Sequence, residues 1–318
     1  MRNNKEIKIS VVVPVKNGMD TLPRFIEGIQ KQSLLSSCEV VIIDSGSDDG
    51  SVEYLKTFDF IKVISIDPKT FNHGATRNLG VTHCNGEFVL MTVQDAWTTD
   101  TKFLERMVDH FKDVSVMGVC GQQVIPHHKD KNPHEWFRPQ SKGSAKKVKF
   151  KTKEAFLTLS PKEQRLSCGW DDVVAMYRKQ ALVDLPFQPL VFGEDMLWAK
   201  MALEKGYALV YDSTVRVFHY HFQFPEYTYK RVLISKFFIY KCFNYFDART
   251  YNYKDYILIV YRNFKWNCAP KWILHNFNII TNHRKATHTL GSAIKNNKIE
   301  ALETELALNI PQGSQNKI

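Results

Sequence analysis

Four acidic residues of this 318-residue sequence stand where a carboxylate could do chemistry. Asp44 directly follows a short apolar run, and Asp95 comes shortly after another. Glu194 and Asp195 open a segment with helical apolar spacing. A carboxylate at a strand end can accept a hydrogen bond from a nucleoside or hold a divalent cation, and one beside an attacking hydroxyl can act as a general base. Turn formation and helix capping are the structural alternatives, and the pattern leaves them open.

A second group of candidates could bind an anion or a metal. Residues 71–80, with the sequence FNHGATRNLG, are predicted to open a helix. A helix start offers unpaired N–H groups to a phosphate, and Arg77 could add a bidentate contact to a diphosphate. An arginine that bridges two elements is the alternative. His219 and His221 occupy alternate positions, which suits metal ligation or a diphosphate contact if the segment is extended.

Short apolar runs alternate with amphipathic segments through residues 9–119, and this order predicts the elements that position the candidates. Such alternation favours an α/β fold with a mostly parallel sheet and helices on both faces. Ligands of such sheets bind beyond the carboxyl ends of the strands, so the polar turns there are expected to gather at one edge. The predicted strands are 9–13, 40–43, 61–66, 88–91 and 114–119, and the predicted helices contain 22–29, 52–55, 75–81 and 103–111.

The rest of the chain predicts two regions of different character. Residues 140–153 carry six lysines and few apolar residues, which predicts a mobile loop or lid; a solvated linker is the alternative. Beyond residue 224 many aromatic and basic residues alternate in helix-like segments, which predicts a helical C-terminal region. We therefore expect one domain at 1–224, divided near residue 125, followed by the region 225–318.

Composition limits the kinds of partner and the cellular compartment to be expected. The net charge of +10 favours an anionic partner, although a solvated basic surface is an equal alternative. The six cysteines are scattered without C-x-x-C spacing, which argues against a zinc module and a disulfide framework. No stretch approaches the ~18 apolar residues of a spanning helix. We expect a cytoplasmic protein, with peripheral contact to the inner face of the cytoplasmic membrane left open.

Several other function classes lack their signatures. No G-x-G-x-x-G follows the first predicted strand and no G-x-x-x-x-G-K-[ST] is present, which argues against a dinucleotide-dependent oxidoreductase and a P-loop enzyme. A nucleic-acid-binding protein would explain the basic, aromatic C-terminal region. It would not explain acidic turns at strand ends, which repel phosphate in the absence of a metal, so no nucleic-acid partner is expected.

Taken in order, these segments resemble the family 2 glycosyltransferases of the GT-A fold, and within them the bacterial rhamnosyltransferases. The resemblance extends over about residues 8–245. Three features carry it: the stretch 71–78, the sequence Gln94-Asp95-Ala96, and Glu194-Asp195 followed by His219-x-His221. It implies a Rossmann-like nucleotide-sugar-binding half at 1–125 and an acceptor-binding half at 126–224.

The resemblance also implies roles for individual residues. Asp195 would be the catalytic base and Glu194 its support, while Trp170 and Trp198 are predicted acceptor contacts. A divalent metal, Mg²⁺ or Mn²⁺, would be held by Asp95, His219 and His221. The predicted nucleotide-sugar contacts are Pro14, Val15, Lys16, Asn17, Asp44, His73, Arg77, Gln94 and Asp95.

The expected reaction is inverting transfer of a sugar from a nucleotide-sugar donor to a saccharide or lipid-linked saccharide acceptor of a bacterial surface polysaccharide. The implied donor is dTDP-rhamnose. Other nucleotide sugars of the UDP-hexose type, and a catalytically silent relative that only binds sugar nucleotides, are the alternatives. The second is prompted by Val93, which stands where most family members carry the first acid of Asp-x-Asp.

Overall fold

The computed structural model describes residues 8–126, 132–137, 142–190, 192–222 and 224–308. The chain forms two compact units. Of the described residues, the first comprises 8–124, 142–190 and 192–220, and the second comprises 125–126, 132–137, 221–222 and 224–308. Each unit has its own hydrophobic core.

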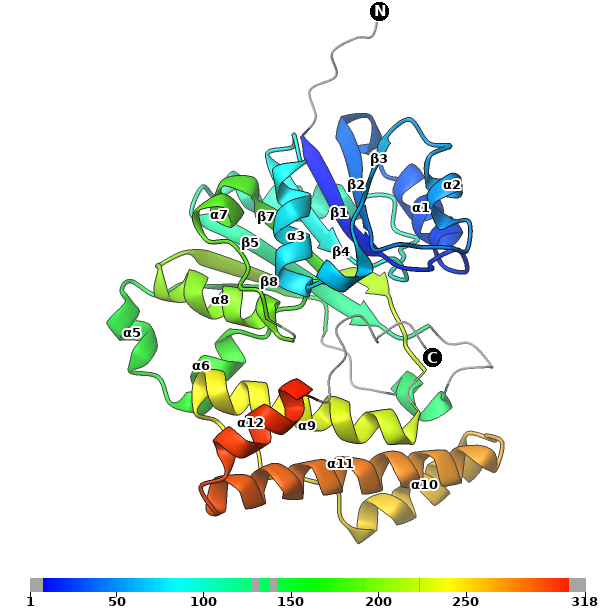
Figure 1. The fold of residues 1–318 in the computed structure, drawn as a ribbon, viewed down its shortest axis with the longest axis vertical. Coiled ribbons are helices and arrows are strands. Elements are labelled where there is room, and N and C mark those ends of the chain that lie inside the picture. Colours follow the sequence, from blue (N-terminus) through cyan, green and yellow to red (C-terminus); the bar gives the residue numbers. More distant parts are fainter. Residues whose placement is uncertain (1–7, 127–131, 138–141, 191, 223, 309–318) are drawn as a thin grey trace, which may run out of the picture. The chain divides into compact units, whose positions relative to one another are not determined.

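The described residues of the first unit form one eight-stranded sheet in the order β3-β2-β1-β4-β7-β5-β8-β6 (Figure 1). β1 to β4 are mutually parallel, and β5 is parallel to β8. β7 lies antiparallel between β4 and β5, and β6 is antiparallel to β8. The strands are β1 (Ile9–Val15), β2 (Cys38–Asp44), β3 (Ile61–Ser65), β4 (Phe88–Thr92), β5 (Val116–Val124), β6 (Ala145–Val148), β7 (Val174–Arg178) and β8 (Ala208–Phe218).

Helices cover both faces of this sheet, which explains why its central strands are apolar throughout. Val11 and Val13 of β1 belong to the core cluster that includes Phe25 of α1. Val12 points to the other face, where it meets Gly80 of α3 so closely that a Cβ at that glycine would lie 2.4 Å from Val12 Cγ1. The helices are α1 (Leu22–Gln30), α2 (Ser51–Leu55), α3 (His73–Thr82), α4 (Phe103–Asp109), α5 (Lys153–Leu157), α6 (Pro161–Ser167), α7 (Lys179–Asp184) and α8 (Glu194–Glu204).

The predicted fold class is confirmed: an α/β sheet flanked by helices is followed by a helical C-terminal region. The sheet contains more antiparallel pairing than the alternation of elements predicts, because β7 lies between β4 and β5 and runs opposite to both. β7 (174–178) is far in sequence from its two neighbours, β4 and β5. Local periodicity therefore gave no information on the direction of this strand.

The prediction of a mobile loop or lid at 140–153 is wrong for residues 145–148, which form the edge strand β6; residues 140 and 141 lie outside the described residues. β6 pairs with β8 from Ala145 opposite Asp212 to Val148 opposite Leu209. Lys147 Nζ also lies 2.7 Å from an Asp113 carboxylate oxygen. An edge strand needs only backbone partners, and exposed lysines protect such an edge from pairing with another chain.

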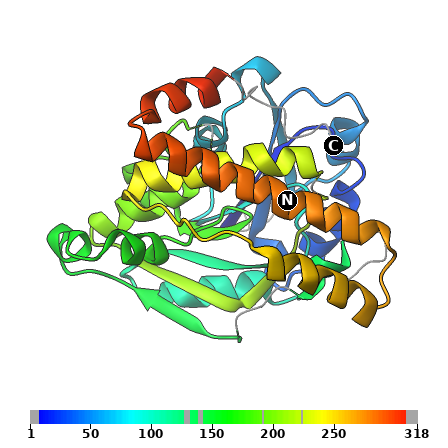
Figure 2. The ribbon, with the colours of Figure 1, turned by 90° about the horizontal axis from the view of Figure 1, so that it is seen from below.

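The second unit is helical, as predicted for the C-terminal region. α9 and α11 pack side by side (Figures 1 and 2). Their core contains Leu233 and Phe237 from α9 and Ala286 and Leu290 from α11. No helix among the described residues is both long and apolar enough to span a membrane. The helices are α9 (Pro225–Phe243), α10 (Tyr253–Lys265), α11 (Lys271–Lys295) and α12 (Ile299–Leu308).

Candidate active site

One edge of the sheet collects the polar segments that the sequence singled out. β1, β2, β4, β5 and β8 all end at this edge, and the antiparallel β7 begins there. The register places Val15 opposite Asp44 and Val124 opposite Phe218, so the following turns start at the same level. Thr92 at the end of β4 pairs with Val174 at the start of β7.

Lys16 ties together the turns after β1, β2 and β4. Its ammonium donates to the carbonyl oxygen of Ser45 at 3.2 Å and to that of Gly46. The Gln94 side chain bonds the Lys16 backbone twice, accepting from its N–H at 2.8 Å and donating to its carbonyl at 3.1 Å. Asn17 has a φ of +47°, a left-handed conformation that asparagine tolerates, and its N–H donates to Ser47 Oγ. These contacts give the predicted nucleotide-binding turns a defined shape.

The carboxylate of Asp44 stabilises the turn that follows β2. The buried carboxylate accepts hydrogen bonds from the backbone N–H groups of Gly46 at 3.0 Å and Ser47 at 3.2 Å. This is the turn-forming alternative that the sequence left open. The contacts of Asp44, Pro14 and Val15 with a nucleotide stay predictions.

Asp95, His219 and His221 form a candidate metal centre. A backbone bridge brings the segment after β4 to the end of β8: Trp97 N–H donates to Phe218 O at 3.0 Å, and Phe218 N–H donates to Trp97 O at 2.7 Å. One ligand atom from each of the three residues lies within 4.8 Å of the others, and Asp95 Oδ2 lies 3.5 Å from His219 Nε2. Two imidazoles and a carboxylate are a donor set that first-row divalent metals such as Mn²⁺ accept. The residues present therefore fit a divalent metal.

Gln123 orients the first of these histidines. Its Oε1 lies 2.6 Å from His219 Nδ1, and its Nε2 donates to Asp171. Because the amide oxygen can only accept, Nδ1 must carry the proton, which leaves Nε2, the nitrogen nearer Asp95, as the ring atom that could bind a metal. Such an outer partner fixes the tautomer of a metal-binding histidine.

Asp195 lies at the start of α8 with its carboxylate partly buried. One oxygen accepts from the Met196 N–H at 2.6 Å, and the other accepts from the Asp172 N–H at 3.2 Å. Burial raises the pKa of Asp195 well above its ordinary value, and the negative charges of Glu194 and Asp172 raise it further. A carboxylate with a raised pKa is a stronger base once it is ionised, which suits proton abstraction from a hydroxyl.

Arg77 is buried between two carboxylates. It forms ion pairs with Glu194 and, at 3.1 Å from its Nε, with Asp172. Burial raises the pKa of Asp172 to about 7, although the charge of Arg77 and a hydrogen bond from Tyr177 act to lower it. The structure thus has Arg77 as a bridge between elements, the alternative that the sequence left open. Its contact with a diphosphate stays a prediction.

Residues 71–80, which include most of α3, also form hydrogen bonds with the segment that leads into α8. Asn72 donates to Leu190 O at 3.2 Å, and Asn78 exchanges two hydrogen bonds with the Phe187 backbone at 2.8 and 3.0 Å. A Cβ at Gly74 would lie 2.1 Å from Gln188 O, so only glycine permits this approach. Asn72 caps the helix by accepting from the Ala75 N–H, while His73 packs edge-on against Phe71. A contact of His73 with the donor stays a prediction.

Comparison with known proteins identifies the family. The sequence model of glycosyl transferase family 2 matches residues 10–182. The chain belongs to this family. It is 29% identical over 228 residues to the O-antigen chain rhamnosyltransferase RfbN of Salmonella typhimurium, covering 71% of this chain and 70% of that protein. It is 30% identical over 227 residues to the O-antigen chain rhamnosyltransferase WbaN of Salmonella anatum, covering 70% and 69%.

Solved structures show the same fold at lower identity. The mannosyltransferase PcManGT from Pyrobaculum calidifontis, in complex with GDP-Man and Mn²⁺, is 16% identical with a TM-score of 0.55, covering 96% of this chain and 81% of that one. S. aureus TarS 1-349 in complex with UDP is 17% identical with a TM-score of 0.51, covering 90% and 92%. The chain is therefore a GT-A glycosyltransferase.

In this glycosyltransferase the predicted acceptor contacts Trp170 and Trp198 are core residues, 4% and 1% exposed. Trp170 Nε1 donates to the Tyr177 hydroxyl at 2.6 Å, and Trp198 Nε1 donates to Leu185 O at 2.8 Å. The ring of Tyr177 packs edge-on against Trp198. Of these aromatic residues, Tyr177 donates a hydrogen bond to the buried carboxylate of Asp172. An acceptor contact by either indole stays a prediction that this burial does not favour.

Three residues that shape the site of this glycosyltransferase are absent from the sequence-based prediction: Gln123, Asp171 and Asp172. Adjacent aspartates directly before the apolar run 173–177 were a usable signal, because a strand in the reverse direction starts at the ligand-binding edge. Gln123 gave no such signal, because a single glutamine near a strand end does not form a recognisable sequence pattern. Its role depends on His219, which lies 96 residues away in the sequence.

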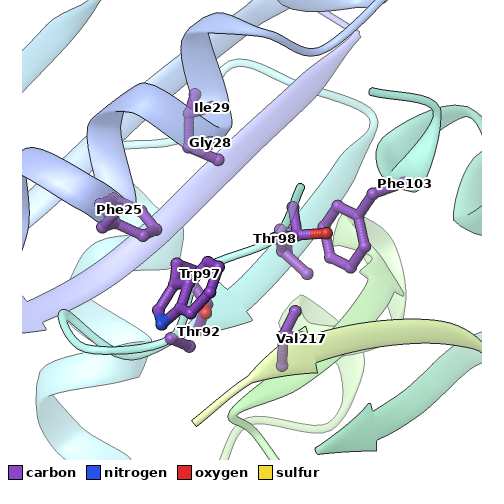
Figure 3. A pocket seen from close by; sticks show the side chains of 10 residues that line it. Phe25, Gly28, Ile29, Thr92, Trp97, Thr98, Phe103 and Val217 are labelled. Atoms are coloured by element: carbon purple, nitrogen blue, oxygen red, sulfur yellow. The ribbon is translucent and has the colours of Figure 1, made fainter. Parts of the chain in front are cut away.

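A separate pocket lies between α1 and the sheet (Figure 3). Phe25, Ile29, Trp97, Phe103 and Val217 line much of it, and the labelled side chains of Figure 3 are mostly apolar. The residues that line it in the described part of the chain include none of the predicted site residues. The pocket has no charged side chain among these lining residues, so the polar edge stays the predicted place for the charged donor.

Proposed function

We propose that this glycosyltransferase transfers L-rhamnose from dTDP-rhamnose to a saccharide acceptor of a bacterial surface polysaccharide, with inversion at the anomeric carbon. The donor sugar is supported by the two relatives named as O-antigen chain rhamnosyltransferases, each matched over about 70% of both chains. A UDP-hexose is the second candidate donor, because TarS 1-349 was solved with UDP and has the same fold.

The observation that carries the catalytic assignment is a continuous series of contacts along the edge of the sheet. It links the turns that would hold the nucleotide to the carboxylate that would act as base. Each step is a hydrogen bond or a peptide bond, except that Asp95 and His219 meet as neighbouring candidate metal ligands, 3.5 Å apart. In order, the residues are Lys16, Gln94, Asp95, His219, Gln123, Asp171, Asp172 and Asp195.

The proposed reaction is a single displacement. Asp195 removes the proton from an acceptor hydroxyl, and the resulting oxygen attacks the anomeric carbon from the face opposite the nucleotide. The bond between that carbon and the diphosphate oxygen breaks as the new glycosidic bond forms, and the nucleoside diphosphate leaves. Glu194 supports the base through its charge, which raises the pKa of Asp195. Lys16, near the carbonyls of the β2 turn, is a candidate cation for the departing diphosphate.

Asp95, His219 and His221 would hold the divalent metal, and a bound metal would neutralise charge on the diphosphate. With one carboxylate and two imidazoles, the donor set suits Mn²⁺ better than Mg²⁺, which prefers oxygen ligands. Val93 supplies no ligand; it is partly buried and packs against the core. The histidines thus replace the missing acid of Asp-x-Asp.

The acceptor is proposed to be lipid-linked, with the enzyme acting at the inner face of the cytoplasmic membrane. The helices of the second unit are rich in aromatic and basic residues, which suits contact with an anionic lipid surface. This association would be peripheral.

A panel of nucleotide sugars tests the donor assignment. The thermal midpoint of the purified chain is measured with dTDP-rhamnose, UDP-glucose, UDP-GlcNAc and GDP-mannose, each with and without Mn²⁺, and nucleotide release is followed with saccharide acceptors. We expect dTDP-rhamnose with Mn²⁺ to give the largest stabilisation and turnover. A larger effect of a UDP-sugar would reassign the donor, and binding without turnover on any acceptor would favour a catalytically silent relative.

A further inference from the structure

Helix α10 presents an apolar side to solvent. Tyr253, Ile257, Tyr261 and Phe264 are 69%, 64%, 56% and 76% exposed, and we call these four residues the α10 face. They follow one another at intervals of four, four and three residues, so they lie along one side of the helix. α10 lies beside α11 (Figure 2), where the ring of Tyr256 packs edge-on against Phe277, and Ile259, on the side away from these four residues, is buried. Large apolar side chains gathered in this way on a surface mark an interaction site.

Cations border this face near both of its ends. Lys254, Arg262 and Lys265 are exposed, and each directly follows a residue of the α10 face. One residue corresponds to about 100° around a helix, so the three cations line one edge of the apolar side. The acidic residue of the helix, Asp255, is held in the capping box, where it accepts from the Asn252 N–H at 2.6 Å. The border is therefore positively charged.

The region of the sequence that contains α10 also has a positive net charge. Residues 225–318 contain fourteen Lys and Arg against six Asp and Glu, a net charge of +8 out of the +10 of the whole chain. A surface with this charge attracts anions over a distance of about one Debye length, ~8–10 Å at moderate salt. A second copy of the chain would bring the same cations to the interface, where like charges repel. The partner with complementary charge is an anionic surface.

We propose that the α10 face docks into an anionic lipid membrane. The helix would lie parallel to the bilayer, with the rings of Tyr253, Tyr261 and Phe264 at the boundary between headgroups and acyl chains. Lys254, Arg262 and Lys265 would reach the lipid phosphates while their alkyl stems cover apolar surface. Thirteen residues of helix extend only ~20 Å, too short to cross the hydrocarbon core. The docking is therefore interfacial.

This inference deepens the membrane association proposed above, and it is independent of the donor sugar and of the catalytic base. Vesicle binding needs no nucleotide sugar, so its failure and the failure of the proposed activity can be told apart. A variant that no longer binds vesicles while dTDP-rhamnose still stabilises it would locate the defect in docking.

The test is flotation of the full chain with vesicles of phosphatidylcholine alone or with 30% phosphatidylglycerol, at low and high NaCl. Two variants alter the proposed surface: I257S/F264S removes apolar area, and K254Q/R262Q/K265Q removes charge. L166S/V183S is the matched control, because Leu166 and Val183 are similarly exposed, at 68% and 57%, on the first unit. Thermal midpoints verify that every variant is folded.

We expect the wild type and the control to float with the anionic vesicles, and to float less at high salt. The variant I257S/F264S should lose about tenfold or more in partitioning, because each large apolar side chain that leaves water contributes roughly that factor. The charge variant should lose its preference for anionic over neutral vesicles. Equal flotation of the wild type and I257S/F264S, or no flotation of the wild type, would overturn the proposal. So would a concentration-dependent dimer, seen by light scattering, that only I257S/F264S abolishes.

Discussion

The Nδ1 atom of His219 lies 2.6 Å from the amide oxygen of Gln123. The same glutamine donates through its nitrogen to Asp171, which fixes which end of the amide is the oxygen. His219 is therefore held with Nε2 facing Asp95, at 3.5 Å from the carboxylate. One uncharged side chain connects the proposed metal centre to the group of aspartates around the proposed base.

Replacing Gln123 should weaken metal binding without unfolding the protein. In Q123A the ring of His219 loses its orienting partner, and loss of such a partner typically lowers metal affinity about 10–100-fold. Mn²⁺ binding measured by electron paramagnetic resonance, with no sugar nucleotide present, reports this directly. Q122A is the matched control, because adjacent strand residues point to opposite faces. Unchanged Mn²⁺ affinity in Q123A would show that Gln123 does not position a ligand.

Removing the carboxylate of Asp195 should stop the chemistry and spare the donor. In D195N no group takes the proton of the acceptor hydroxyl, so we expect kcat/KM to fall by about 10²–10⁴-fold while the Kd for the donor changes little. Initial rates and calorimetric donor binding measure the two quantities. D184N, which alters an exposed aspartate of α7, is the control. Near wild-type turnover of D195N would refute the assignment of the base.

The pH dependence of turnover should respond to Glu194. A general base must be ionised, so kcat/KM should fall as pH drops through the pKa of Asp195, which burial and the charges of Glu194 and Asp172 raise above its ordinary value. In E194Q one of these charges is gone, the pKa of Asp195 falls, and the acid limb moves to lower pH. Profiles of kcat/KM against pH for the wild type and E194Q measure the shift. An acid limb that stays in place, or moves upward, contradicts this electrostatic coupling.

Arg77 should matter for stability more than an exposed arginine does. In R77L the carboxylates of Glu194 and Asp172 are left buried without their cation, and breaking a buried pair in this way typically costs about 3–5 kcal/mol. Urea unfolding measures the free energy of unfolding. R231A, at an exposed position, is the control.

A double variant separates this structural role of Arg77 from a role in ligand binding. R77L/E194L should be more stable than R77L, because one of the two unpaired carboxylates is removed. If R77L instead unfolds like the wild type but binds dTDP-rhamnose much more weakly, the main partner of Arg77 is the diphosphate, as the resemblance implied.

Much of the fold was readable from local pattern. The apolar runs at 9–13, 40–43 and 88–91 became central strands, and the spacing of Leu22, Phe25, Ile26 and Ile29 became the buried side of α1. These strands are covered on both faces and α1 is packed along one side. Their buried positions therefore form an apolar run or a helical apolar spacing that can be recognised in the sequence. The edge strand β6 was not readable, because its side chains are exposed and its only requirement is the backbone of β8.

The sequence by itself determined which acidic groups stand at or after strand ends and which open a helix: Asp44 ends β2, Asp95 follows β4 and the pair Glu194-Asp195 opens α8, in an order typical of one family. The tertiary structure decided the surroundings of each carboxylate. Asp44 accepts hydrogen bonds from its own turn, and Glu194 forms an ion pair with Arg77. Asp195 lies among other acidic residues, which help to raise its pKa. The physical reason is that burial and charge act through space. Glu194 meets its cation across 117 residues of chain, a distance over which no local pattern carries information.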